Sequence, residues 1–200
     1  MKNANTTRHT LLQRLQLSHD ERAWDEFSGI YGGYIRAILR GYGFSPDDSD
    51  DLLQEVMIKV WKALPGYTYG KRNCKFRTWL GTVIRNAAIN HRRQKMNRDR
   101  RNTIAIEEMC VKLELKSDAE IEEITLREWK LHVYKMAWGN VADSLSDTMR
   151  AVFEESQKED DNAVLAQKFG VTESSIRVYK MRVRKVLIRE IARLDADLDG

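Results

Sequence analysis

Residues 163–176, AVLAQKFGVTESSI, decide the fold of the C-terminal part of the chain. The small side chain of Ala166 permits the close crossing of two helices, and Gly170 suits a turn that needs a positive φ. Thr172 is a good N-cap for a second helix, and Ile176 is the inward apolar residue of that helix. The pattern therefore predicts a helix-turn-helix.

The second helix of this motif, predicted over 172–194, carries a strong positive charge. Between Arg177 and Arg189 there are six basic residues and no acidic one. A recognition helix places its first polar residues against base edges in the major groove, while Arg and Lys also reach phosphates. An ordinary helical hairpin with a basic outer face would have the same pattern, and this alternative stays open.

Apolar residues spaced three and four apart predict more helices upstream of the motif. Only two prolines occur, Pro46 and Pro65, and the long proline-free remainder favours long helices. The charged, aperiodic stretch after Gln94 predicts a linker. We expect an all-α fold of two small helical domains, over 1–95 and 119–200, joined by a linker over 96–118. The predicted helices are about 22–42, 50–64, 76–94, 118–138, a short one near 146–153, and 162–169.

Composition excludes several classes of protein. The 200 residues are 42% hydrophobic and 32% charged with a net charge of +4, which argues against a wholly disordered chain. No apolar stretch reaches ~18 residues, and the first residues lack the apolar block of a secretory signal. Cys74 and Cys110 stand 36 apart without a CxxC motif, which argues against a disulfide scaffold or a zinc cluster. We expect a cytoplasmic protein without metal or cofactor, and no enzyme.

Three short stretches stand out in the N-terminal half. They are DDLLQEV at 50–56, FRTWL at 76–80, and the pair Arg85-Asn86, which opens a basic segment of net charge +6 that ends at Arg101. Core packing alone could explain the aromatic residues, and the preference of acids for helix N-termini could explain the aspartates. Two separate basic segments nevertheless favour a polyanionic partner.

Together with the helix-turn-helix, these stretches resemble a small sigma factor of the extracytoplasmic-function (ECF) group. Members of this group are promoter-specificity subunits of bacterial RNA polymerase. The resemblance covers about 24–93 and 149–190. It implies a sigma region 2 over 1–95 and a sigma region 4 over 119–200. It also implies that core RNA polymerase and promoter DNA are partners, and it allows an anti-sigma factor as a third.

The resemblance further implies three sets of contact residues. Those expected to bind core polymerase are Asp51, Gln54, Glu55, Ile58 and Trp61. Those expected to face the minus-ten DNA are Arg85, Asn86, Asn90 and Arg93. Those expected to meet the minus-thirty-five duplex are Ser174, Ser175, Arg177, Lys180, Arg182 and Arg184. Asn90 stands where many members carry aspartate, and YKMRV at 179–183 is not the commonest recognition-helix pattern.

Two other functions fit parts of the sequence. A stand-alone helix-turn-helix transcriptional regulator would use the first domain for sensing or dimerisation and would bind a palindromic site. An enzyme acting on nucleic acid would need clustered carboxylates or a metal site. The dense acids are Asp47, Asp48, Asp50 and Asp51, and they lie at a predicted helix start.

Overall fold

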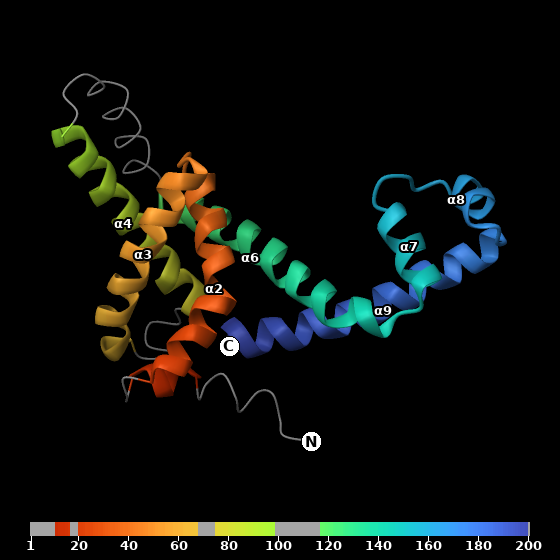
Figure 1. The fold of residues 1–200 in the computed structure, drawn as a ribbon, viewed down its shortest axis with the longest axis horizontal. Coiled ribbons are helices and arrows are strands. Elements are labelled where there is room, and N and C mark those ends of the chain that lie inside the picture. Colours follow the sequence, from red (N-terminus) through yellow and green to blue (C-terminus); the bar gives the residue numbers. More distant parts are fainter. Residues whose placement is uncertain (1–10, 17–19, 68–74, 99–116, 200) are drawn as a thin grey trace. The chain divides into compact units, whose positions relative to one another are not determined.

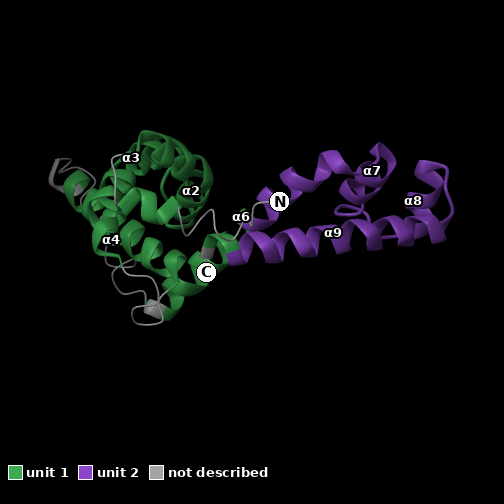
Figure 2. Ribbon diagram, turned by 90° about the horizontal axis from the view of Figure 1, so that it is seen from below, with its two compact units in different colours: residues 1–132, 197–200 green, residues 133–196 purple. Residues whose placement is uncertain are grey.

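The structure, a computed structural model, describes residues 11–16, 20–67, 75–98 and 117–199. The described residues form helices and no strand (Figure 1), which confirms the all-α expectation. They divide into two compact units, residues 1–132 with 197–200 and residues 133–196 (Figure 2). None of the described helices is both long and apolar enough to cross a membrane.

An aromatic cluster forms the core of the first unit. It joins α2 (Glu21–Gly41), α4 (Phe76–Arg98) and the first part of α6 (Asp118–Val141). Phe76 lies 5.3 Å from Tyr31 and 6.1 Å from Phe27 between ring centroids, and Tyr34 lies 5.3 Å from Trp129. All five side chains are buried. Such rings bury large apolar areas, so this cluster fixes the packing of three helices.

The helix α3 (Pro46–Ala63) begins four residues earlier than its periodicity predicts. The Oγ of Ser45 accepts a hydrogen bond from the Asp48 N–H at 3.1 Å, which caps the helix. Pro46 occupies the first turn, where the missing N–H costs nothing because it has no intrahelical partner. The cap and the proline therefore set the start, rather than the first apolar residue.

The second unit contains the predicted helix-turn-helix, formed by α8 (Asn162–Phe169) and by α9 (Glu173–Asp199) as far as residue 196, with α7 (Asp147–Glu155) packed beside them. Its core cluster consists of Val152, Leu165, Ala166 and Ile176. Gly170 has φ 64°, so the turn uses the left-handed backbone that glycine tolerates. The helix α8 has the predicted bounds. The helix α9 ends five residues later than predicted, because its buried face continues through Leu194 and Leu198.

The division between the units falls inside α6. Residues 119–132 belong to the first unit, where the hydroxyl of Tyr34 donates a hydrogen bond to the Thr125 carbonyl at 3.2 Å. The expected second domain began at 119. Most of the expected linker, residues 99–116, lies outside the described residues, as do Cys74 and Cys110.

The helices α4 and α6 approach each other closely at Gly81. A Cβ atom placed on Gly81 would lie 2.6 Å from Cγ2 of Thr125, and Thr125 is buried. A side chain at Gly81 would therefore separate the two helices or force Thr125 to move.

We expect Gly81→Ala to lower the free energy of unfolding by about 1–3 kcal/mol, because the clash outweighs the gain in helix propensity. Gly33→Ala is the control, since a Cβ at this helical position meets nothing within 4 Å. Adding Thr125→Ser to Gly81→Ala removes the clashing methyl group and should restore most of the loss. Urea denaturation measures all three changes. A Gly81→Ala chain as stable as the wild type would contradict this account.

Candidate nucleic-acid interface

The outer face of α3 carries exposed apolar side chains. Its inner stripe, which includes Leu52, Val56 and Val60, is buried. On the outer face Ile58 is 52% exposed and Trp61 43% exposed. The five residues predicted to bind core polymerase are spaced so that they all lie on this outer face. They are Asp51, Gln54, Glu55, Ile58 and Trp61.

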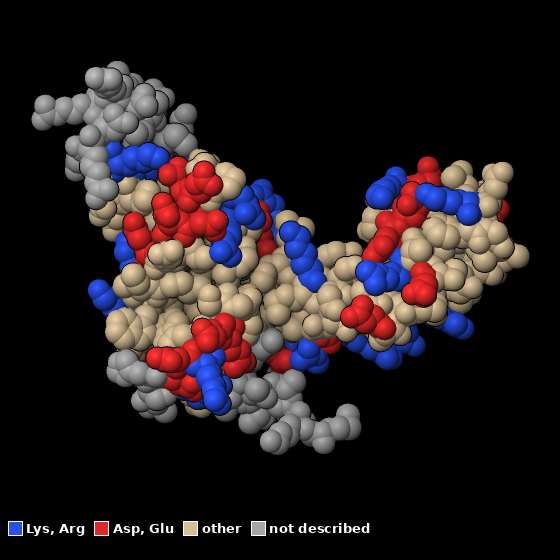
Figure 3. Space-filling view, viewed as in Figure 1, with Lys and Arg blue, Asp and Glu red and all other residues tan. Residues whose placement is uncertain are grey.

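Acidic side chains gather over the first turns of α3 (Figure 3). Part of this charge is neutralised by neighbouring helices. Lys95 Nζ lies 3.0 Å from Asp48, and Arg36 Nε lies 2.5 Å from Asp50. Glu55 is also within hydrogen-bond distance of His91 Nδ1, at 3.1 Å. The hydrogen bond from Lys95 holds the pKa of Asp48 below its usual value. Asp51 forms no ion pair with any described residue, so it adds negative charge to the exposed face.

The exposed face of α4 is formed by Asn86, Asn90 and Arg93. Their spacing of four and three places them along one side of the helix. Arg85, the fourth residue predicted to face the minus-ten DNA, is half-buried. The structure therefore brings three of the four predicted side chains together at the surface.

Arg92 has a structural role within the same basic segment. It is buried, donates a hydrogen bond to the Tyr42 carbonyl, and lies 4.4 Å from the centre of the Phe44 ring. These contacts attach α4 to the end of α2. Burial also raises the pKa of the Tyr42 phenol to about 12. A basic residue in this segment therefore does not always add positive charge to the surface.

The helix α9 exposes most of the side chains predicted to meet the duplex. Ser174, Arg177, Arg182 and Arg184 are exposed, and Arg177 is paired with Glu173 at 2.9 Å. Ser175 is half-buried, and its N–H donates to Oγ1 of Thr172 at 3.1 Å. This hydrogen bond confirms Thr172 as the capping residue of α9.

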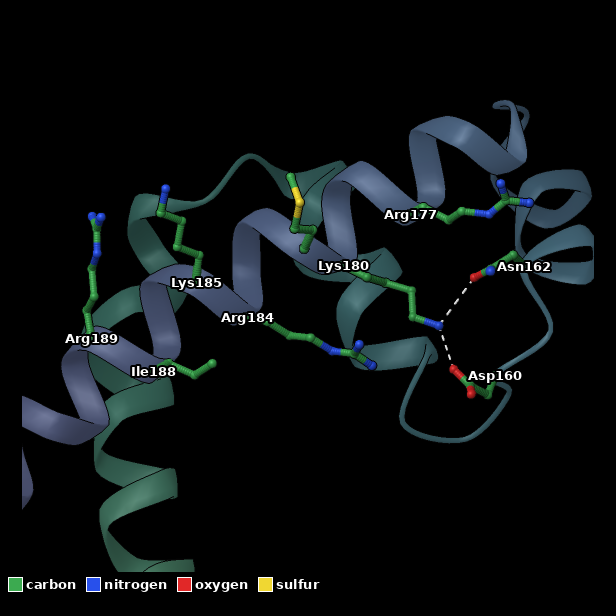
Figure 4. A pocket seen from close by; sticks show the side chains of 9 residues that line it. Asp160, Asn162, Arg177, Lys180, Arg184, Lys185, Ile188 and Arg189 are labelled. Atoms are coloured by element: carbon green, nitrogen blue, oxygen red, sulfur yellow. Dashed lines mark hydrogen bonds and ion pairs between the residues drawn. The ribbon is translucent and has the colours of Figure 1, made fainter.

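Lys180 differs from the other basic residues of α9. Its side chain is 9% exposed, and its ammonium group contacts Asp160 at 2.5 Å and Asn162 at 3.3 Å (Figure 4). Asp160 lies just before α8, and Asn162 is the first residue of that helix. Lys180 is thus buried, unlike the arginines that were predicted with it to meet the minus-thirty-five duplex.

Four cations of α9 lack an ion pair among the described residues: Arg182, Arg184, Lys185 and Arg189. By contrast, both basic residues of α7 and α8 are paired, Arg150 with Glu154 at 3.2 Å and Lys168 with Glu155 at 2.9 Å. Three of the four line a groove of about 670 Å³ with Met181 and Ile188 (Figure 4). The contact set predicted from the resemblance omitted Lys185 and Arg189, although the run of six bases already included them. Unpaired cations along one helix form a surface suited to a polyanion.

Replacing these four cations with glutamine should weaken duplex DNA binding without destabilising the fold. The exposed side chains have no ion pairs to lose, so the free energy of unfolding should change by less than about 0.5 kcal/mol per site. If all four meet phosphates, the slope of log K against log salt should fall in magnitude by roughly 3.6. Filter binding at several salt concentrations measures the slope. The control is Arg150→Gln/Lys168→Gln, which removes two paired cations; a loss of slope of about 1.8 there, the same per cation, would count against the assignment.

Residues 30–98 match the family model of sigma-70 region 2. The match contains all of α3 and α4, and therefore both exposed faces described above. No curated protein matches the chain. Among solved structures, the chain is similar to the structure of CnrH in complex with the cytosolic domain of CnrY. The identity is 18% and the TM-score 0.35, over 95% of this chain and 98% of that chain. Residues 30–98 are thus similar to the region 2 domain of the sigma-70 family.

Proposed function

We propose that this chain is a sigma factor of the ECF type, which binds core RNA polymerase and directs transcription initiation at specific promoters. The observation that carries the proposal is the match of residues 30–98 to sigma-70 region 2, which coincides with the outward apolar face of α3. We assign region 2 to 1–95, the linker to 96–118 and region 4 to 119–200.

The outer face of α3 is the proposed surface for core polymerase. Ile58 and Trp61 supply apolar area that is exposed in the free chain. Exposed apolar groups rimmed by polar ones are typical of protein interfaces, and large aromatic side chains often dominate their binding energy. Asp51, Gln54 and Glu55 would form the polar rim and would favour a partner surface with basic groups.

The exposed face of α4 is the proposed site for the melted minus-ten strand. The amides of Asn86 and Asn90 each offer a donor and an acceptor, which can pair with the edges of unstacked bases. Arg93 would contact the phosphate backbone. Extruding a base costs a few kcal/mol, which contacts of this kind must offset. Arg85 is half-buried and would contact the strand only at the edge of this site.

The helix α9 is the proposed reader of the minus-thirty-five duplex. Ser174 and Arg177 lie in its first turns, where a recognition helix meets base edges. Arg182 and Arg184 lie further along and would contact phosphates, which supply affinity without sequence preference. Lys185 and Arg189 extend this basic surface.

Ile58→Lys should lower the affinity for core polymerase at least about tenfold, equivalent to about 1.4 kcal/mol. The change places a charge in the centre of the proposed interface, while the exposed position leaves the fold intact. Leu131→Lys is the matched control, because Leu131 is 50% exposed on α6, outside the proposed interface. Fluorescence anisotropy with labelled chain and purified core polymerase measures both. Equal affinities for the two variants would contradict the assignment of α3.

Run-off transcription tests the function as a whole. Purified core polymerase is incubated with a pool of upstream promoter fragments, with and without the chain. We expect specific transcripts only when the chain is present. No transcripts and no core binding, together with tight binding of the chain alone to a palindromic duplex, would favour a stand-alone regulator instead.

A further inference from the structure

Lys180 lies in the middle of the basic segment of α9, yet it faces the protein. Two of its three possible hydrogen bonds go to Oδ1 of Asp160 and Oδ1 of Asn162, at 2.5 and 3.3 Å. An ammonium group at this depth is costly unless it is paired and hydrogen-bonded, and these two oxygens meet that need. Figure 4 shows the Lys180 side chain pointing toward both partners, while Lys185 and Arg189 point elsewhere.

The two partners flank the start of α8. Between them, Asp161 is the N-cap, and its Oδ1 accepts a hydrogen bond from the Ala163 N–H at 2.7 Å. The helix α8 has eight residues and is about 12 Å long. Its far end is joined to α9 through the turn at Gly170. The ammonium group of Lys180 therefore attaches the near end of α8 to the same helix.

Apolar contacts already join these helices, and the contact of Lys180 is of a different kind. The cluster of Val152, Leu165, Ala166 and Ile176 supplies burial, which is a non-directional force. The hydrogen bonds of Lys180 depend on distance and angle. They add a second point of attachment, distant from the turn, that resists rotation of α8 over α9.

We propose that Lys180 is a positioning residue that holds α8 against the recognition helix through Asp160 and Asn162, and that it is not a phosphate contact. The DNA measurements below rest on the proposed role of α9. The contact itself can be tested without DNA.

The two possible roles of Lys180 predict opposite effects for Asp160→Asn. If Lys180 bound phosphate, Asp160 would compete with DNA for the ammonium group, and its neutralisation would strengthen binding or leave it unchanged. If Lys180 positions α8, Asp160→Asn and Lys180→Met should both weaken binding, each on the order of tenfold. The double variant should then bind no more weakly than either single variant, because both changes break one contact.

The salt dependence separates the roles further. The full-length chain is used with a duplex that the wild type selects from a random pool, and log K is measured against log salt. Lys180→Met should leave the slope unchanged, since no phosphate contact is lost. Arg182→Gln is the matched control, an exposed cation two residues away without an ion pair, and should reduce the slope by about 0.9. A loss of about 0.9 for Lys180→Met, or tighter binding by Asp160→Asn, would overturn the proposal.

A measurement without DNA tests the contact directly. The ammonium group of Lys180 is the main cause that holds the pKa of Asp160 below its usual value, and the charge of Arg184 adds a smaller effect in the same direction. In a carboxyl-carbon NMR titration, Lys180→Met should raise the pKa of Asp160 towards its ordinary value. An unchanged titration would refute the contact. If the wild type selects no duplex, the role of α9 in DNA binding fails, and this titration still decides whether Lys180 holds Asp160.

Discussion

The packing of Phe76 against the rings of α2 is the interaction on which the first unit depends. Phe76 is the first residue of α4, and its contacts with Phe27 and Tyr31 fix one end of that helix. The close approach of Gly81 to Thr125 fixes the rotation of α4 one turn later. Because helical side chains are arranged by rotation about the axis, these two constraints also determine that Asn86 and Asn90 face outward. The candidate DNA surface of α4 is thus a consequence of its core.

Burial and ion pairing together separate structural charges from charges at the surface. Neighbouring residues of α4 illustrate this, since Arg92 is buried against Phe44 and the Tyr42 carbonyl while Arg93 is exposed. The helix α9 shows the same contrast between Lys180 and Arg184. A net charge of +6 over either basic segment therefore overstates the positive surface that a nucleic acid would meet. Burial and the positions of the paired carboxylates therefore decide which cations remain at the surface.

The sequence predicted the helices well because apolar periodicity and turn residues are local signals. The bounds of α8 follow from the pattern around Gly170, and the start of α4 follows from Phe76. The predicted helix ends were less accurate for α3, whose start is set by its cap, and for α9, which continues past the predicted end through a buried leucine. The burial of Lys180 could not be predicted, because its partner Asp160 lies 20 residues earlier in another element. Residue type and spacing on α9 contain no information about that contact.

Under the proposed function, the chemistry of the two DNA surfaces matches two different states of DNA. The face of α4 exposes two amides and one guanidinium, a composition suited to the edges of unstacked bases rather than to dense phosphate charge. The face of α9 exposes cations without internal partners, and a duplex carries one phosphate charge per about 1.7 Å of its axis. Cations supply affinity that falls steeply with salt, whereas amide contacts depend little on salt. Duplex binding and recognition of the melted strand would therefore respond differently to ionic strength, so that salt weakens duplex binding by α9 more than it weakens the amide contacts of α4 with the melted strand.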